Sequence, residues 1–221
     1  IEVTKAIRQS KIKISKKYIY DTKPTNLTKQ IEDITNYKIR KQNLADEILR
    51  VKKSDLEDKE KQLEKLEKRY TIGNVKFDSV IIADFEESLK SVITSLLYTD
   101  VSPKNKYFIT FNQWFDDSLL KEKHIQPIYF PSVNKKNYDQ FSSEYQKKFG
   151  QYPNQLSFLS FDLVGLVYYL ILQNNLEIND KIFVKKNKFK GKVGIFDIKD
   201  NKINHILNFY KVENSKFKKV F

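Results

Sequence analysis

The sequence predicts an α/β fold in which a mostly parallel sheet is flanked by helices. Two observations predict it: short runs of β-branched and aromatic residues alternate with helical segments, and the last part of the chain alternates like a hairpin. Strands that alternate with helices form parallel sheets with right-handed crossovers. At 221 residues the chain is long enough for one large domain or two small lobes.

The first third of the chain predicts a helix end, a strand and a long helix. Residues 1–10 have apolar side chains at helical spacing, and residues 12–20 alternate apolar and polar side chains like a half-buried strand. Thr25 or Asn26 is placed to cap the next helix, whose apolar stripe continues to Val51. We therefore expect one continuous helix after the strand.

A strongly charged segment follows at residues 52–69. Basic and acidic residues are almost balanced there, and the only apolar residues are Leu56, Leu63 and Leu66. A coiled coil requires several sustained heptads, and this stretch offers barely two. The pattern therefore favours a solvated helical arm, within residues 39–72.

From Gly73 onward, strands and helices alternate regularly. The run 77–83 is nearly continuous in β-branched residues, as in a strand that is covered on both faces. Asp84 begins an amphipathic helix. The remaining predictions are strands at 107–111 and 128–130, helices at 138–149 and 156–172, and a final hairpin of 193–198 with 203–212 around Asp200-Asn201. The helix at 156–172 is so apolar that we expect it to be buried.

Composition excludes several classes of site. There is no cysteine, and His124 and His205 are too far apart in the sequence for a recognisable zinc or Ser-His signature. No glycine-rich phosphate loop precedes a helix. We therefore expect no thiol catalysis, no metal site and no cofactor.

The net charge of +13 is concentrated at the two ends of the chain. Residues 1–53 and residues 182–221 each carry +8, whereas the middle carries −3. A basic nucleic-acid-binding domain is one interpretation. Arginine, which is preferred for phosphate contacts, occurs only at Arg8, Arg40, Arg50 and Arg69. We favour a general enrichment of the composition in lysine as the explanation of the positive charge. We therefore expect no nucleic acid as a partner.

Five residues are candidate ligand contacts because they follow predicted parallel strands, where open α/β sheets place their ligands. They are Asp84, Phe85, Asn112, Trp114 and Asp116. Trp114 serves equally well as a hydrophobic plug between lobes. The acidic clusters around Asp84 and Asp116 are interpreted as helix caps rather than as a metal site.

Several motifs, taken in order, resemble the second lobe of type I periplasmic binding proteins. More narrowly, they resemble the penicillin-binding protein activator (LppC-like lipoprotein) family. The motifs are 77–85 (FDSVIIADF) with 96–101, Trp114-Phe115-Asp116-Asp117-Ser118-Leu119-Leu120, the aromatic spacing from Tyr138 to Pro153, Phe161-Asp162-Leu163-Val164, and Phe189-x-Gly191-x-x-Gly194. The charged arm matches an insertion in some relatives of that family.

The resemblance implies the carboxy-terminal portion of a two-lobed protein whose first lobe is incomplete. Residues 11–133 and 189–221 would form the second lobe, and residues 134–188 the helices that return to the first. The chain opens on Ile1 rather than methionine, which we interpret as a processed product or a fragment.

The resemblance also implies a non-enzymatic periplasmic protein that stimulates a peptidoglycan synthase. Outer-membrane anchoring would depend on an amino-terminal lipid outside this chain. The alternative within the fold is the solute-binding component of a branched-chain amino-acid or amide transporter. That reading implies a small amino-acid-like ligand, for which Asp84 and Asn112 could be the remaining contacts.

Overall fold

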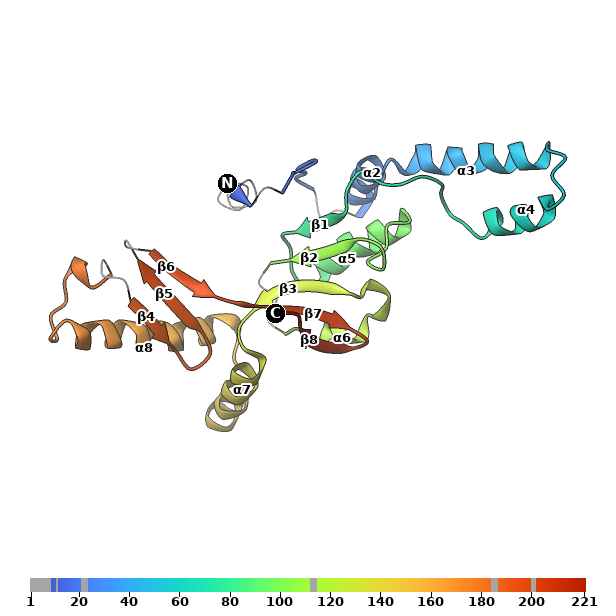
Figure 1. Cartoon of the computed structure of the whole chain (residues 1–221). Helices are drawn as coiled ribbons and strands as arrows, with labels where there is room; N and C mark the ends of the chain where they lie inside the picture. Colours follow the sequence, from blue (N-terminus) through green and yellow to red (C-terminus); the bar gives the residue numbers. More distant parts are fainter. Residues whose placement is uncertain (1–8, 11, 21–23, 112–114, 184–186, 200–201) are drawn as a thin grey trace. The chain divides into compact units, whose positions relative to one another are not determined.

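The computed structural model describes residues 9–10, 12–20, 24–111, 115–183, 187–199 and 202–221. The predicted α/β class is confirmed, with a mostly parallel sheet and flanking helices (Figure 1). The chain divides into two compact units. The first comprises residues 1–109 and 124–128, and the second comprises residues 110–123 and 129–221.

The described strands form two sheets, one of five strands in the order β1-β2-β3-β7-β8 and one of three in the order β4-β5-β6. The three-stranded sheet is antiparallel throughout, and β7 pairs antiparallel with β8. The strands are β1 Ser79–Ile82, β2 Tyr107–Thr110, β3 Ile128–Ser132, β4 Asn187–Lys190, β5 Ile195–Lys199, β6 Lys202–Ile206, β7 Asn208–Glu213 and β8 Lys216–Lys219.

Seven α-helices and two short 3-10 helices are described in full. They are α2 Pro24–Thr35, α3 Tyr37–Lys52, α4 Lys59–Glu67, α5 Glu86–Tyr98, α6 Ser118–Lys121, η1 Lys123–Ile125, α7 Lys135–Phe149, α8 Gln155–Gln173 and η2 Asp180–Phe183. The carboxyl end of α7 follows the expected chemistry, because Gly150 takes the left-handed φ of 72° that glycine adopts without steric cost.

The predicted single helix up to Val51 is wrong, because Asn36 divides it into α2 and α3. Asn36 has a left-handed φ of 50°, a conformation that asparagine tolerates better than most residues. Apolar residues still point inward on both helices, with Leu27 and Ile31 buried on α2 and Leu44 and Val51 on α3. The apolar stripe therefore predicted the buried face but not the break.

The strand predicted at residues 12–20 is also wrong. None of these residues belongs to a strand, and residues 12–19 are exposed. An alternating pattern shows which side chains would share a face, but a strand also requires a hydrogen-bonded neighbour. No described strand pairs with this segment. Residues 1–8 of the helix end predicted at 1–10 lie outside the described residues.

The charged arm forms a short helix. Residues 59–67 make up α4, which has no buried residue, as expected of a solvated helix (Figure 1). Lys68 pairs with Glu64 at i,i+4 spacing on its exposed surface.

The strand β1 is present where the sequence predicts it, but the expected burial of both its faces is wrong. It lies at one end of the strand order, and Ile81 is 41% exposed whereas Ile82 is buried. The helix after it is amphipathic as predicted, and Leu89, Val92, Ile93 and Leu96 of α5 are buried.

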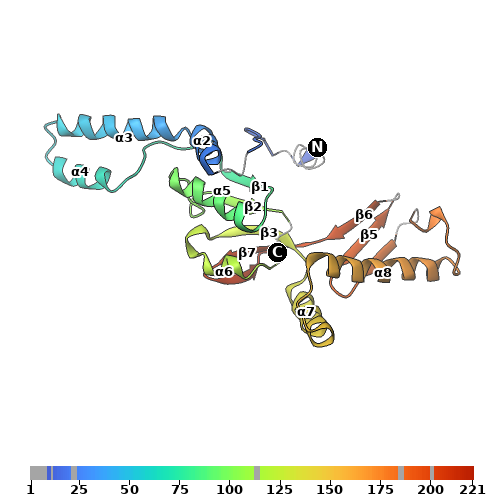
Figure 2. The ribbon, with the colours of Figure 1, turned by 180° about the vertical axis from the view of Figure 1, so that it is seen from behind.

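In the second unit, the predicted burial of the apolar helix is wrong. Leu166 and Leu170 of α8 pack against Ile198 of the three-stranded sheet, but the opposite side of the helix is exposed. Both views show α8 lying along that sheet (Figures 1 and 2). A continuous apolar run indicates a helix but does not show how many of its sides are covered.

The terminal hairpin is confirmed by the pairing of β5 with β6, in which Lys199 lies opposite Lys202. Its turn residues, 200–201, lie outside the described residues. The second arm predicted at 203–212 is wrong as one strand, because it is divided into β6 and β7, which belong to different sheets.

Candidate functional site

At the carboxyl end of β1, the candidate residues Asp84 and Phe85 lie in the first unit. The Tyr20 hydroxyl donates a 2.6 Å hydrogen bond to Asp84 Oδ2, and the Phe85 backbone N–H donates to Asp84 Oδ1 at 2.9 Å. Burial and the Asp84 carboxylate together raise the pKa of Tyr20 far above its usual range. Asp84 therefore holds residues 12–20 to the start of α5, and Phe85 is half exposed.

The candidate Asp116 lies in the second unit, two residues before the start of α6. Its two carboxylate oxygens accept from the Ser118 backbone N–H at 2.8 Å and from the Ser118 hydroxyl at 2.7 Å. The capping interpretation is met only in part: Asp116 accepts from the first N–H of α6, but the N-cap residues of α5 and α6, Phe85 and Asp117, make no side-chain capping bond. Asn112 and Trp114 lie outside the described residues.

Next to Asp116, Phe115 is buried at a strained φ of 30°. Its ring contacts those of Phe130, Tyr138, Tyr210 and Phe217, with centroid distances of 5.0 to 5.8 Å. Aromatic rings in edge-to-face contact stabilise a core beyond the area they bury. This position is therefore part of the core of the second unit.

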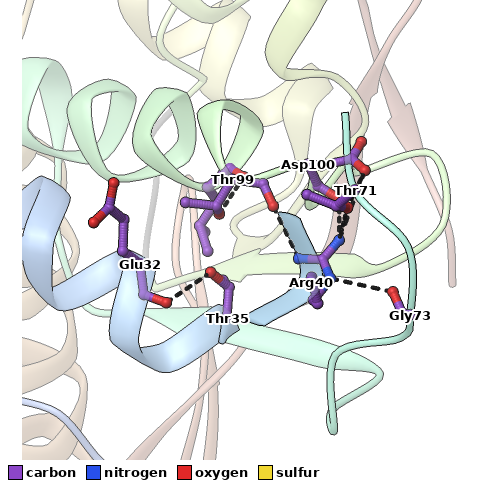
Figure 3. A network of polar contacts seen from close by, with 8 residues as sticks. Glu32, Thr35, Arg40, Thr71, Gly73, Thr99 and Asp100 are labelled. Atoms are coloured by element: carbon purple, nitrogen blue, oxygen red, sulfur yellow. Dashed lines mark hydrogen bonds and ion pairs between the residues drawn. The ribbon is translucent and has the colours of Figure 1, made fainter. Parts of the chain in front are cut away.

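Arg40, which the sequence analysis did not select, lines a cavity of about 350 Å³ in the first unit, and Figure 3 shows its polar contacts. Arg40 of α3 is 6% exposed and donates to the carbonyl oxygens of Gly73 at 3.1 Å and Thr99 at 2.9 Å. Its Nη2 also donates to Thr71 Oγ1 at 2.7 Å. The cavity lining further includes Lys68, Arg69, Asn105 and Lys106.

The Arg40 network explains why a charge can be buried here. The carbonyls of Thr99 and Asp100 follow the end of α5, where the helix dipole favours a cation, and the Asp100 carboxylate lies 3.7 Å from the guanidinium. Burial lowers the pKa of Arg40, and Asp100 opposes that shift. The only sequence signal for this role is that Arg40 shares the buried face of α3 with Tyr37 and Leu44.

In the second unit, a buried carboxylate fastens α8 to its sheet. Asp162 is 3% exposed and accepts backbone N–H bonds from Lys192 at 2.8 Å, Val193 at 3.0 Å and Gly194 at 2.6 Å. A Cβ on Gly191 would lie 2.5 Å from Asp162 Cγ, so only glycine allows this approach. This contact joins residues of two motifs of the sequence, Phe161-Asp162-Leu163-Val164 and Phe189-x-Gly191-x-x-Gly194.

The outward side of α8 is an apolar surface, which we call the α8 face. Its side chains are between 47% and 70% exposed, and they are Leu156, Phe161, Leu163, Val164, Tyr168 and Leu172. At about 170 Å² per side chain, these residues expose roughly 600 Å² in total. Isolated folded proteins seldom expose apolar patches larger than about this size.

The same helix is long and apolar enough to cross a membrane, since residues 156–173 have a mean hydropathy of 1.6 and only 22% of that window is buried. However, its inner side is already occupied by protein, and the bonded carboxylate of Asp162 lies near its middle. One side of α8 is packed against the sheet and the other side exposes apolar side chains. A helix of this kind is suited to docking against another surface.

Comparisons with known proteins add little to this geometry. No protein-family model and no curated protein matches the chain. Among solved structures, an extracellular ligand binding receptor from Desulfohalobium retbaense DSM5692 is similar with a TM-score of 0.48 and 14% identity, covering 65% of this chain. The chain spans only 26% of the length of that receptor.

Proposed function

We propose that this chain works by binding another protein through the α8 face rather than by catalysis. The partner that its sequence resemblance implies is a bifunctional peptidoglycan synthase, which the chain would stimulate in the periplasm. The observation that carries the proposal is the roughly 600 Å² of apolar side chain exposed on α8. A standard protein–protein interface buries about 800 Å² per partner, so this face could supply most of one side.

The groups that could carry chemistry are engaged in holding the chain together. Arg40 is bonded to carbonyl and hydroxyl oxygens, Asp162 to three backbone N–H groups, Asp116 to Ser118, and Asp84 to Tyr20. Two of these pairs join a hydroxyl to a carboxylate, Ser118 to Asp116 and Tyr20 to Asp84, and each lies beside the start of a helix as a structural contact. This arrangement supports binding as the function of the described part of the chain.

The chemistry of the α8 face favours a protein over a lipid or nucleic-acid surface. Asp162 is the only charged residue of α8, and it is turned inward. The lysines of β4, Lys188 and Lys190, alternate with Phe189, which packs towards α8, so they lie on the opposite face of the sheet. Anionic membranes and nucleic acids require basic residues beside the contact.

The proposal is tested by measuring the affinity of the purified chain for a purified bifunctional peptidoglycan synthase, together with the rate of glycan polymerisation. We expect the double variant Val164→Glu/Tyr168→Glu to weaken binding at least tenfold and to abolish stimulation, because two carboxylates would be desolvated in the interface. The matched control is Ile39→Glu, which changes a 62% exposed apolar residue on α3 and should leave both readouts unchanged.

Three outcomes would overturn the proposal. One is the absence of binding to the synthase, and another is equal binding by the double variant and the native chain. The third is binding of the native chain to phosphatidylglycerol vesicles that the double variant loses, which would assign the α8 face to a membrane surface. A melting shift with a free branched-chain amino acid would favour the solute-binding alternative.

A further inference from the structure

We propose that the cavity beside Arg40 is a binding site for a small polar molecule that carries a phosphate ester. The residues that line it all belong to the first unit, whereas the α8 face belongs to the second. The inference therefore goes beyond the proposed function and does not depend on it. At about 350 Å³, the cavity falls within the size range of small-molecule sites.

Hydrogen bonds fix the wall that the segment after α4 contributes to this cavity. Arg40 of α3 accepts from the Ile72 N–H at 3.0 Å through its carbonyl and donates to the Gly73 carbonyl through its side chain (Figure 3). The Thr71 hydroxyl donates to Asp100 Oδ2 at 2.5 Å, which joins the same segment to the residues just after α5. Because this wall is held on two sides, a ligand would bind without the cost of ordering it.

The charges that line the cavity do not cancel. Arg40 is compensated, since it is bonded to carbonyl oxygens and lies 3.7 Å from Asp100, the only acidic residue among the described residues of the lining. Three further cations line the cavity: Lys68, Arg69 and Lys106. The lining therefore has an excess of positive charge, which attracts an anion.

Among the described residues, Arg69 and Lys106 are the two lining cations that lack a close counter-ion. Lys68 already pairs with Glu64. The side chain of Lys106 is only 17% exposed, and its ammonium lies 3.7 Å from the exposed carboxylate of Asp78, which is too far for a hydrogen bond. The Arg69 guanidinium has no bonded partner within the described part of the chain. A bound anion would supply the missing negative charge to both side chains.

A phosphate ester fits these two cations better than a carboxylate does. A phosphate monoester carries close to two negative charges at pH 7, so it can pair with Arg69 and Lys106 together, whereas a carboxylate carries only one. Arginine also binds phosphate oxygens through two parallel N–H donors. The amides of Asn74 and Asn105 line the same cavity and can bond the hydroxyl groups of a polar molecule. The phosphate could belong to a soluble sugar phosphate or to a lipid headgroup.

Isothermal titration calorimetry of the whole chain at constant ionic strength tests the inference, with glucose 6-phosphate, gluconate and glucose as probes. We expect glucose 6-phosphate to bind at least tenfold more tightly than gluconate, which carries a single charge, and glucose to give no measurable binding. Arg69→Gln and Lys106→Gln should each weaken the binding of glucose 6-phosphate at least tenfold.

The matched control is Arg50→Gln, which removes the same charge from an exposed arginine of α3 that does not line the cavity. It should change the affinity less than twofold. Because Arg69 is exposed, Arg69→Gln keeps the test valid even where Lys106→Gln disturbs the loop before β2.

Sedimentation with phosphatidylcholine vesicles that contain phosphatidic acid distinguishes the two sources of the phosphate. Retention on the vesicles that Arg69→Gln abolishes would assign the site to a lipid headgroup, whereas binding of glucose 6-phosphate without retention would assign it to a soluble ester.

Three outcomes contradict the inference. The first is that neither glucose 6-phosphate nor the vesicles bind. The second is that gluconate or glucose binds as tightly as glucose 6-phosphate, which would show that the site does not select a doubly charged group. The third is equal weakening by the substitutions at Arg69, Lys106 and Arg50, which would indicate a general effect of net charge.

Discussion

At the scale of single residues, the two buried charges show how backbone groups replace water. Arg40 is surrounded by carbonyl oxygens near the end of α5, and Asp162 by three N–H groups of the β4–β5 turn. Charge-assisted hydrogen bonds of this kind are roughly twice as strong as neutral ones. Removing either charge leaves several backbone groups buried without a partner, which costs more than the bonds contribute.

We therefore expect Asp162→Asn to lower the free energy of unfolding by about 2–4 kcal/mol, since an amide cannot accept from all three donors. Urea unfolding followed by circular dichroism measures the change. The control is Asp139→Asn, because Asp139 is half exposed and forms only a surface pair with Lys135, and its loss should cost less than about 0.5 kcal/mol. Equal effects of the two substitutions would contradict the structural role of Asp162.

Gly194 of the same turn gives a second prediction, with Gly150 at the end of α7 as its comparison. A Cβ on Gly194 would lie 2.4 Å from His205 Nε2, whereas one on Gly150 would meet nothing within 4 Å. Gly194→Ala should cost about 1–3 kcal/mol or more by overpacking. Gly150→Ala should cost about 1 kcal/mol, from its positive φ alone. Thermal unfolding of both variants tests the order, and a smaller effect at Gly194 would refute it.

His205 makes the stability of the chain depend on pH. Burial lowers its pKa below the ordinary value of 6.5, although nearby Asp162 opposes the shift. The unfolded state therefore binds the proton more readily, so this contribution is fully present above about pH 6.5 and is lost as the pH falls through the pKa of the folded state. We expect His205→Phe, which keeps the stack on Phe196, to flatten this decline between pH 7 and 5.

The pH prediction has an internal control in the other histidine. His124→Gln changes an exposed side chain, so the decline should remain as steep as in the native chain. Urea unfolding at a series of pH values compares the three proteins. A decline that follows His124, or one that persists fully in His205→Phe, would show that His205 is not the group responsible.

At the scale of elements, the local sequence pattern predicted whether a segment is a helix or a strand better than it predicted how far the segment is buried. The spacing of Leu89, Val92, Ile93 and Leu96 predicted α5 and its buried side, and Asp200-Asn201 predicted the β5–β6 hairpin. Two failures concern breaks, at Asn36 between α2 and α3 and between β6 and β7, and the others concern burial, since β1, α8 and residues 12–20 were expected to be more covered than they are. The sequence pattern indicates which side of an element is apolar. It does not indicate whether another element of the described fold covers that side.

The candidate site was predictable only in part, for the same reason. Position after a strand selected Asp84 and Asp116, but their hydrogen bonds to Tyr20 and Ser118 depend on tertiary contacts. Arg40 escaped selection because its partners Thr71, Gly73 and Thr99 are distant in the sequence. Asp162 was noted within a motif, but its three donors lie about thirty residues later.

The two sides of α8 should respond differently to truncation. Leu166→Ala removes a fully buried side chain and should cost about 2–5 kcal/mol. Val164→Ala trims a side chain that is 70% exposed and should change stability by less than about 0.5 kcal/mol. Urea unfolding distinguishes the two sides. A large loss at Val164 would mean that the α8 face is already packed within the isolated chain.

At the scale of the whole molecule, the net charge and the apolar α8 face have different effects on association. The net charge of +13 opposes the association of copies, because like-charged chains repel. The α8 face has no outward charge, so another protein can be accommodated there without an unpaired ion in the interface. Charge therefore opposes self-association, and under the proposed function the apolar surface is where the partner binds.

Because the sequence contains no cysteine, a single introduced thiol reports directly on this surface. The most direct test is the alkylation rate of Val164→Cys, with Lys202→Cys on the exposed strand β6 as the matched control, in the free chain and in a verified synthase complex. We predict that the synthase slows alkylation at position 164 at least tenfold and leaves position 202 unchanged. Equal alkylation at position 164 with and without bound synthase would contradict the account.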